Sequence, residues 1–165
     1  MKKLIILFLV LAGLSSFAQR QKVFVKEGEI FVNGDRLAFI EKEGCKLLSQ
    51  TCQFFITDEA DKLLITVSMR SFADREQASP QFPDGVSVSY LVFSFKGIDA
   101  TAEVDCPSMA VKEEQVAKII ARWGLIRDGE LVPDAVDQLI THYGNRFSEK
   151  ERRQNQPPAI QVFHE

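Results

Sequence analysis

The sequence has few of the residues from which catalytic and metal sites are usually built. Only two histidines, three cysteines and one tryptophan occur among its 165 residues. The cysteines and histidines include no close-spaced ligand pair such as C-x2-C or H-x3-H, so we expect no structural zinc. The motifs G-x-S-x-G and H-E-x-x-H, a glycine-rich phosphate loop and an EF-hand pattern are absent too. These absences favour a protein that is not an enzyme and that uses no cofactor or metal.

Long apolar runs are also missing. The run Leu4 to Leu11 (LIILFLVL) is too short to span a bilayer, which takes roughly 20 residues. It follows Lys2 and Lys3 and leads to small residues that end at Ala18, an order typical of a secretory signal peptide. We therefore expect residues 1–18 to be removed, no transmembrane segment to remain, and the product to be periplasmic or secreted. The alternative is an uncleaved N-terminal anchor.

The remaining residues have no excess of positive charge. Removal of the first 18 residues leaves 147, with 18 basic and 23 acidic side chains and a net charge of −5. Such a chain repels phosphate, so we expect no nucleic-acid partner. Its apolar fraction of about 42% is ordinary for a globular protein. We predict one α+β domain over residues 19–147.

Turn signals divide residues 22–106 into strands. Asn33-Gly34 lies between apolar runs, which is a strong hairpin signal because both turn positions need a positive φ. Residues 90–93 (YLVF) are apolar on both faces, so we expect this strand to be central. The pattern predicts an antiparallel meander of about seven strands, either a curved sheet or a partly open barrel.

The hydrophobic period changes to that of a helix in the last third of the chain. Two sets of apolar residues recur at positions i, i+3, i+4 and i+7, which predicts two short amphipathic helices over about 109–123 and 133–143: Val116, Ile119, Ile120 and Trp123, then Val136, Leu139, Ile140 and Tyr143. Ser108 is a candidate cap for the first helix, Gly124 a stop, and Pro133 suits the first position of the second.

The last residues have weaker signals. Ser148 begins a capping-box pattern, so a further helical turn is expected there. Beyond it the sequence is polar and includes Pro157 and Pro158, and we expect residues 148–165 to form a partly disordered tail. Residues 160–163 either add an edge strand or fray.

The cysteines leave two questions open. Cys45 and Cys52 flank the connection between the third and fourth strands, and they form either a disulfide or two buried thiols. Cys106 precedes a predicted helix N-terminus, a position that suits a reactive thiol. With His142 as its base it would make a hydrolase or thiol enzyme, which is the alternative to a structural cysteine at a strand end.

A binding role rests on the loop from Ala73 to Gly85. It is long for a hairpin connection and contains Phe82, Pro83 and Asp84 among polar residues, so it is a candidate contact for an envelope protein or ligand. The alternative is a mobile, solvated loop that only joins two strands. Because phenylalanine outnumbers tryptophan and tyrosine by 13 to three, the aromatic content predicts core packing rather than sugar stacking.

Three stretches carry a resemblance to a group of proteins. Phe17-Ala18-Gln19, residues 25–34 (VKEGEIFVNG), and the run from Gly124 to Ser148 resemble small exported proteins of unknown function from Bacteroidota. The resemblance implies export and a compact α+β domain, and it carries over no catalytic residue. Together with the residues above, it favours a non-enzymatic binding or interaction module of the bacterial cell envelope. A secreted structural protein is a further alternative.

Overall fold

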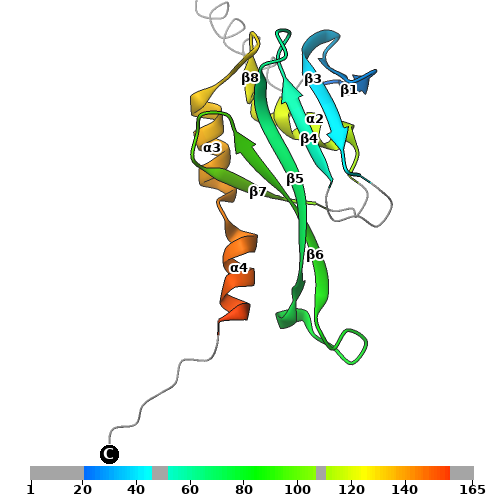
Figure 1. Ribbon diagram of the computed structural model, residues 1–165, viewed down its shortest axis with the longest axis vertical. Coiled ribbons are helices and arrows are strands. Elements are labelled where there is room, and N and C mark those ends of the chain that lie inside the picture. Colours follow the sequence, from blue (N-terminus) through cyan, green and yellow to red (C-terminus); the bar gives the residue numbers. More distant parts are fainter. Residues whose placement is uncertain (1–20, 46–51, 107–110, 157–165) are drawn as a thin grey trace, which may run out of the picture.

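A computed structural model of the chain describes residues 21–45, 52–106 and 111–156 (Figure 1). Seven antiparallel strands form one sheet, and each strand lies beside its neighbour in the sequence. They are β1 (Val23–Lys26), β2 (Glu29–Val32), β3 (Asp35–Glu43), β4 (Gln53–Thr57), β5 (Leu63–Asp74), β6 (Val86–Phe95) and β7 (Thr101–Asp105). Within the described residues β1 and β7 form the two edges, so the sheet is not closed into a barrel. The predicted α+β meander is confirmed.

The β2–β3 turn forms where the sequence predicts it, and the β4–β5 turn is fixed by an aspartate. Asn33 and Gly34 have φ of 57° and 103°, so the β2–β3 hairpin uses the two positive values that its turn needs. In the β4–β5 turn, Oδ1 of Asp58 accepts hydrogen bonds from the backbone N–H groups of Ala60 and Lys62, at 2.8 and 2.9 Å. An aspartate that bonds its own turn in this way fixes the turn locally.

The main core lies on one face of the sheet. Alternate residues of β6 (Leu91, Phe93 and Phe95) point into it, each 4% exposed or less. Tyr90 and Val92 lie on the opposite face and are also buried. β6 is therefore covered on both faces, as its apolar run predicts. It lies beside the edge strand β7, however, and not at the centre of the sheet as expected.

Two of the helices cover the main core. α2 (Glu113–Trp123) packs against β1 and β2, and α3 (Pro133–Tyr143) packs against β7. Their apolar stripes are buried as predicted, through Val116 and Ile120 on α2 and Val136 and Leu139 on α3. The sheet is thus layered with these helices on the face that Leu91 and Phe93 share.

The C-terminal end of α2 agrees with the sequence prediction, whereas its N-terminal end does not. Gly124 adopts the left-handed conformation (φ 61°), and the N–H of Leu125 bonds to the carbonyl of Ile120, as in a Schellman stop. The helix begins at Glu113 rather than near 109, with Lys112 at the N-cap. Ser108, the candidate cap, lies outside the described residues.

The connection between α2 and α3 is a small hairpin, which the sequence analysis did not predict. β8 (Ile126–Arg127) pairs with β9 (Glu130–Leu131), and Asp128 and Gly129 form the turn with φ of 52° and 75°. The Asp-Gly pair is itself a hairpin signal. The adjoining strands are only two residues long, too short to show an alternating pattern. Pro133 opens α3 as predicted.

The C-terminal part forms the helix expected near Ser148, and this helix is longer than the single predicted turn. Residues 146–155 form a third helix, α4 (Arg146–Asn155), which continues the fold beyond residue 147 (Figure 1). The polar sequence of α4 has no apolar stripe, and none of its residues is fully buried. Contacts with the sheet, described below, hold it. Residues 157–165 and the predicted signal peptide lie outside the described residues.

Helices α2, α3 and α4 are 11, 11 and 10 residues long. Among the residues that the structure describes, none of the helices has the length and apolar character that crossing a membrane requires.

Candidate functional site

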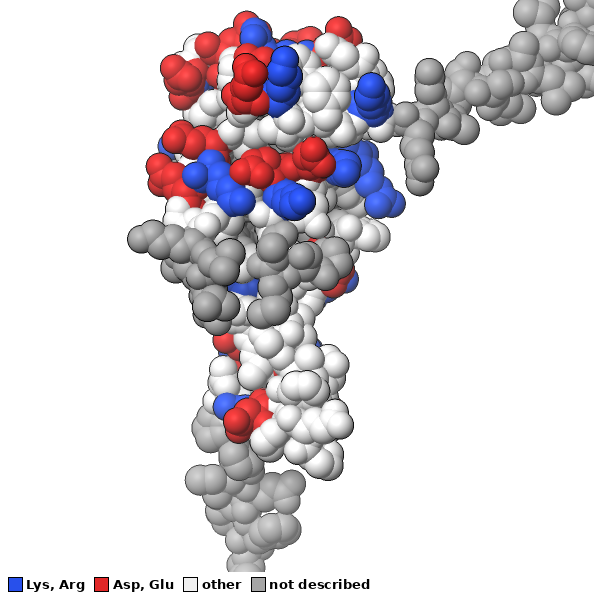
Figure 2. All heavy atoms as spheres, turned by 90° about the vertical axis from the view of Figure 1, so that its right-hand side faces the viewer, with Lys and Arg blue, Asp and Glu red and all other residues white. Residues whose placement is uncertain are grey.

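The β5–β6 hairpin extends well beyond its neighbouring strands. β4 pairs with β5 only as far as Ser68, and β7 pairs with β6 only from Tyr90 onward. Residues 71–88, which we call the arm, therefore project from the end of the sheet (Figure 1). Figure 2 shows charges of both signs over the upper part of the visible face, whereas the projecting lower part is mostly uncharged. The charged residues of the arm are Asp74, Arg75, Glu76 and Asp84.

The tip of the arm is built by backbone hydrogen bonds. After a short 3-10 helix, η2 (Arg75–Gln77), Ser79 and Phe82 bond to each other through both of their N–H groups, at 3.1 and 2.9 Å. The carbonyl of Phe82 also accepts a hydrogen bond from Gly85. The predicted binding residues Phe82, Pro83 and Asp84 therefore sit on a defined turn, where all three are exposed.

Phe82 is the one large hydrophobic residue classed as exposed among those described, with 53% of its surface accessible. A single exposed apolar residue is common on protein surfaces. Here it stands on the turn that ends a projecting arm, beside the exposed residues Pro83 and Asp84. That combination makes the tip a candidate contact site.

The base of the tip accepts only glycine at position 85. Gly85 has φ of +98°, and a Cβ atom there would lie 2.4 Å from the carbonyl oxygen of Asp74. Both the positive φ and the close approach of two backbones exclude a side chain. The tip is consequently held against the last residue of β5.

Asp74 is a buried carboxylate that joins the arm to α4. It is 2% exposed. Its Oδ2 accepts hydrogen bonds from Lys150 Nζ at 2.8 Å and from Gln77 Nε2 at 2.6 Å. Its Oδ1 accepts from Gln154 Nε2 at 2.8 Å and from the N–H of Glu76 at 3.3 Å. The hydrogen bond from Lys150 is the main reason that the pKa of Asp74 lies well below its usual value, against the opposing effect of burial.

A second, smaller apolar cluster lies between the arm and α4. Phe147 stacks on Tyr90 with ring centres 4.8 Å apart, and Phe72 meets Tyr90 edge-on at 6.2 Å. Val88 and Val92 complete this cluster. Burial raises the pKa of Tyr90. Aromatic packing on one side and the Asp74 hydrogen bonds on the other thus fix the arm to the helix.

The beginning of α4 is capped from the sheet. Glu103 of β7 is 3% exposed, and its Oε2 accepts hydrogen bonds from the N–H groups of Phe147 and Ser148, at 2.7 and 3.0 Å. Ser148 is therefore not the cap that the sequence predicts. It lies within the first turn, and Asn145 at the N-cap makes no side-chain capping bond. A distant carboxylate satisfies the helix N-terminus instead.

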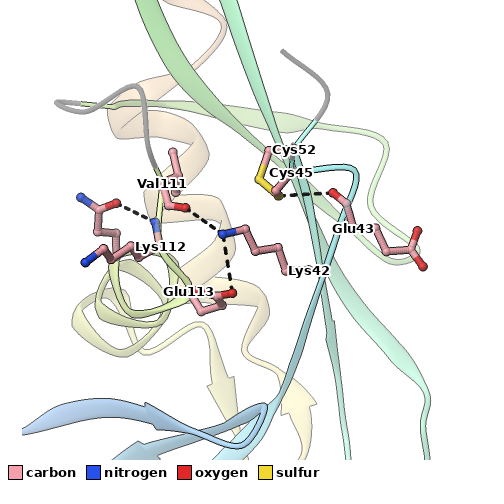
Figure 3. Close-up of a disulfide and its surroundings, with 8 residues drawn as sticks. Lys42, Glu43, Cys45, Cys52, Val111, Lys112 and Glu113 are labelled. Carbon is pink, nitrogen blue, oxygen red and sulfur yellow. Dashed lines mark hydrogen bonds and ion pairs between the residues drawn. A yellow bond between two sulfur atoms is a disulfide. The ribbon is translucent and has the colours of Figure 1, made fainter. Parts of the chain in front are cut away.

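Cys45 and Cys52 form a disulfide between the end of β3 and the start of β4 (Figure 3). This resolves the alternative left open by the sequence. Nearby, Lys42 Nζ lies 3.4 Å from the carbonyl oxygen of Val111 and 3.7 Å from the carboxylate of Glu113, at the start of α2. The disulfide therefore closes the connection between β3 and β4, and Lys42 joins the same end of β3 to the N-terminus of α2.

Cys106 and His142 occupy separate environments. Cys106 follows β7, is half-buried and is packed against the main core. His142 is exposed on α3, and its ring contacts are with Trp123 at 5.3 Å and Tyr143 at 4.6 Å. The thiol-enzyme alternative built on Cys106 and His142 stays a prediction.

A charged hollow of about 650 Å³ lies between the β4–β5 turn and the β8–β9 hairpin. Arg36 lines it and pairs with Glu59 at 2.5 Å and with Glu29 at 3.3 Å. The hydrogen bond with Glu59 raises the pKa of Arg36. Within residues 21–45, 52–106 and 111–156, no cluster of His, Cys, Asp or Glu is arranged to hold a metal ion. Two arginines and four acidic residues line this hollow, so acidic side chains predominate in it.

Comparisons of the chain with models of protein families, with curated proteins and with solved structures found no match. The case for a function therefore rests on the geometry. Of the residues singled out in the sequence, Phe82, Pro83 and Asp84 come together on one turn. The sequence did not predict the contacts that hold the arm, which are those of Asp74 and Glu103 with α4. Each of these contacts joins residues that are far apart in the sequence.

Proposed function

We propose that this protein is an exported binding module of the bacterial cell envelope and that it contacts its partner through the tip of the arm. The observation that carries the proposal is the 53% exposure of Phe82 at the end of a projecting hairpin. An exposed aromatic side chain on an ordered turn loses little conformational entropy on binding, which suits it to anchor a protein contact.

The support of the arm strengthens this proposal. A hairpin that leaves its sheet is poorly stabilised in water unless something packs against it. Here α4 braces the arm through its hydrogen bonds to Asp74 and through the cluster around Tyr90. A braced tip presents Phe82, Pro83 and Asp84 in one geometry, as recognition requires.

Two further observations agree with export. The Cys45–Cys52 disulfide belongs to a type of bond that persists in oxidising compartments. The first 18 residues have the sequence pattern of a signal peptide. Expression of the full chain in a bacterial host, followed by fractionation and N-terminal sequencing, tests this part. We expect a periplasmic or secreted product that begins at Gln19, and cytoplasmic accumulation of the intact chain would contradict it.

The contact itself is tested by site-specific photo-crosslinking in cells of the source organism. A benzoyl-phenylalanine at position 82 is compared with the same group at position 118, an exposed residue of α2. We expect one discrete adduct from position 82 that is absent from position 118. The variant Phe82→Ala, competing against the wild type for that partner, should bind at least about tenfold more weakly, whereas Gln81→Ala should bind as the wild type does. No adduct, the same adducts at both positions, or full binding by Phe82→Ala would refute the proposal.

A further inference from the structure

A second surface lies between the C-terminal end of α2 and the exposed side of α3. A hollow of about 550 Å³ is lined by Trp123, Asp137, Gln138, Thr141 and His142. The last four are exposed residues of α3 at spacings that place them on one side of the helix. The hollow thus has one aromatic wall and one wall of polar side chains.

The aromatic wall is firmly held. Trp123 is half-buried and packs against the main core. The ring of Tyr143 meets it edge-on at 5.8 Å, and the ring of His142 lies 5.3 Å away at a tilt of 48°. Three rings from two helices therefore support each other, and the indole is fixed before any ligand arrives.

The polar wall offers side-chain groups that are available to hydrogen-bond a ligand. The side chains of Asp137, Gln138 and Thr141 form no hydrogen bond or ion pair within the described residues. They offer a carboxylate, an amide and a hydroxyl next to the indole. No lysine or arginine lines the hollow.

We propose that this hollow binds a neutral saccharide. A pyranose ring has a face of C–H bonds, which packs on an indole, and a rim of hydroxyl groups, which bond to carboxylate, amide and hydroxyl side chains. A quaternary ammonium ion would use the indole and Asp137 but none of the other hydrogen-bonding groups. Asp137 and the absence of a cation disfavour an anionic sugar.

The location of the single tryptophan differs from what the composition predicts for the aromatic residues. Thirteen phenylalanines against one tryptophan and two tyrosines indicate core packing for the aromatic residues as a class. The tertiary structure nevertheless places that tryptophan and one of the tyrosines together at a polar surface.

The same tryptophan supplies the assay, because all intrinsic indole fluorescence of the protein comes from this site. The purified mature chain is titrated with cellohexaose, maltohexaose and chitohexaose, each up to about 10 mM, a range that captures weak binding. We expect at least one of them to change the emission with saturation. Oligogalacturonate, which is anionic, should bind more weakly than the best neutral probe.

Matched variants locate the binding. Asp137→Asn and Gln138→Ala should weaken it by about tenfold or more, since each removes hydrogen bonds to the ligand. Asp134→Asn, on the same helix but outside the hollow, and Phe82→Ala, at the arm, should leave it unchanged. Circular dichroism establishes that each variant is folded.

Three results would overturn the proposal. They are no saturable change with any neutral probe, unchanged affinity in both Asp137→Asn and Gln138→Ala, and binding of choline without binding of the oligosaccharides. Because Phe82 takes no part, loss of the arm's function would leave this result unaffected, and the two proposals fail independently.

Discussion

The ammonium group of Lys150 lies 2.8 Å from Oδ2 of Asp74, although the two residues are 76 positions apart in the sequence. Asp74 ends β5 and Lys150 lies in the middle of α4, so the pair joins the arm to a helix that buries no residue completely. Lys150 also pairs with Glu76 at 2.8 Å. Because Asp74 is almost fully buried, this contact is less screened by water than the exposed ion pairs elsewhere on the surface.

The pairing of Asp74 predicts a dependence of stability on pH. Its folded-state pKa is depressed below the usual value of 3.8, so its ionised form stabilises the fold. That contribution is fully present above the unfolded pKa, and it is lost progressively as the pH falls below about 4. We expect the difference in melting temperature between wild type and Asp74→Asn to be constant from pH 5 to pH 7 and to shrink below pH 4. Thermal melts at each pH measure it, and a difference that stays constant to pH 2.5 would contradict the assignment.

The cap from Glu103 predicts a loss of stability. Glu103→Ala leaves two N–H groups of α4 without their acceptor, so we expect the free energy of unfolding to fall by about 1–3 kcal/mol. Glu103→Gln, which keeps one side-chain oxygen, should lose less. Urea denaturation gives the free energies, and amide hydrogen exchange should show faster exchange in α4 than in the wild type. Equal stability of the alanine variant and the wild type would show that the cap contributes nothing.

The disulfide closes a short loop, which limits its contribution. Replacement of both cysteines in Cys45→Ser/Cys52→Ser should lower the free energy of unfolding by about 2–3 kcal/mol, mainly because the unfolded chain regains conformational freedom. Denaturation with and without a reducing agent measures this. The reductant should destabilise the wild type by a similar amount and leave the double variant unchanged. A reductant effect of equal size on both proteins would place the effect elsewhere.

Gly85 and Gly97 form a matched pair that separates two causes of strain. Both have a positive φ, +98° and +82°, but only Gly85 has backbone atoms where a Cβ would lie. Gly97→Ala should cost about 1–2 kcal/mol from the left-handed conformation alone. Gly85→Ala should cost at least about 1 kcal/mol more, because the tip must move away from Asp74. Chemical denaturation of both variants tests the order, and equal losses would show that the close approach at Gly85 carries no strain.

Much of the fold follows from short-range signals. Asn33 and Gly34 mark a hairpin, Gly124 a helix end and Pro133 a helix start, because the backbone angles of these residues are constrained wherever they occur. The apolar run that begins at Tyr90 identified a strand that is buried on both faces, although that strand lies next to the edge of the sheet. The Asp128-Gly129 turn was equally readable as a hairpin signal, but its two-residue strands gave no pattern to accompany it.

The candidate site was only partly predictable. The loop containing Phe82 stands out in the sequence by its length and its prolines. The contacts that hold this loop in place do not stand out in the sequence. Glu103, for example, is one acidic residue in an ordinary strand pattern, and no neighbouring residue marks it as a helix cap. Trp123 was assigned to a helix stripe, which is correct, but the polar residues beside it come from another helix.

The sequence alone determined the order of the strands, the hairpin turns and the ends of two helices, since each depends on the conformational limits of neighbouring residues. The tertiary structure alone decided that Cys45 pairs with Cys52, that polar residues 146–155 form a helix, and that the arm is held in place. These outcomes depend on groups brought together from distant positions. Asp74 and Glu103 stabilise α4 only once β5 and β7 are in the sheet, and no periodicity in the residues of α4 records those partners.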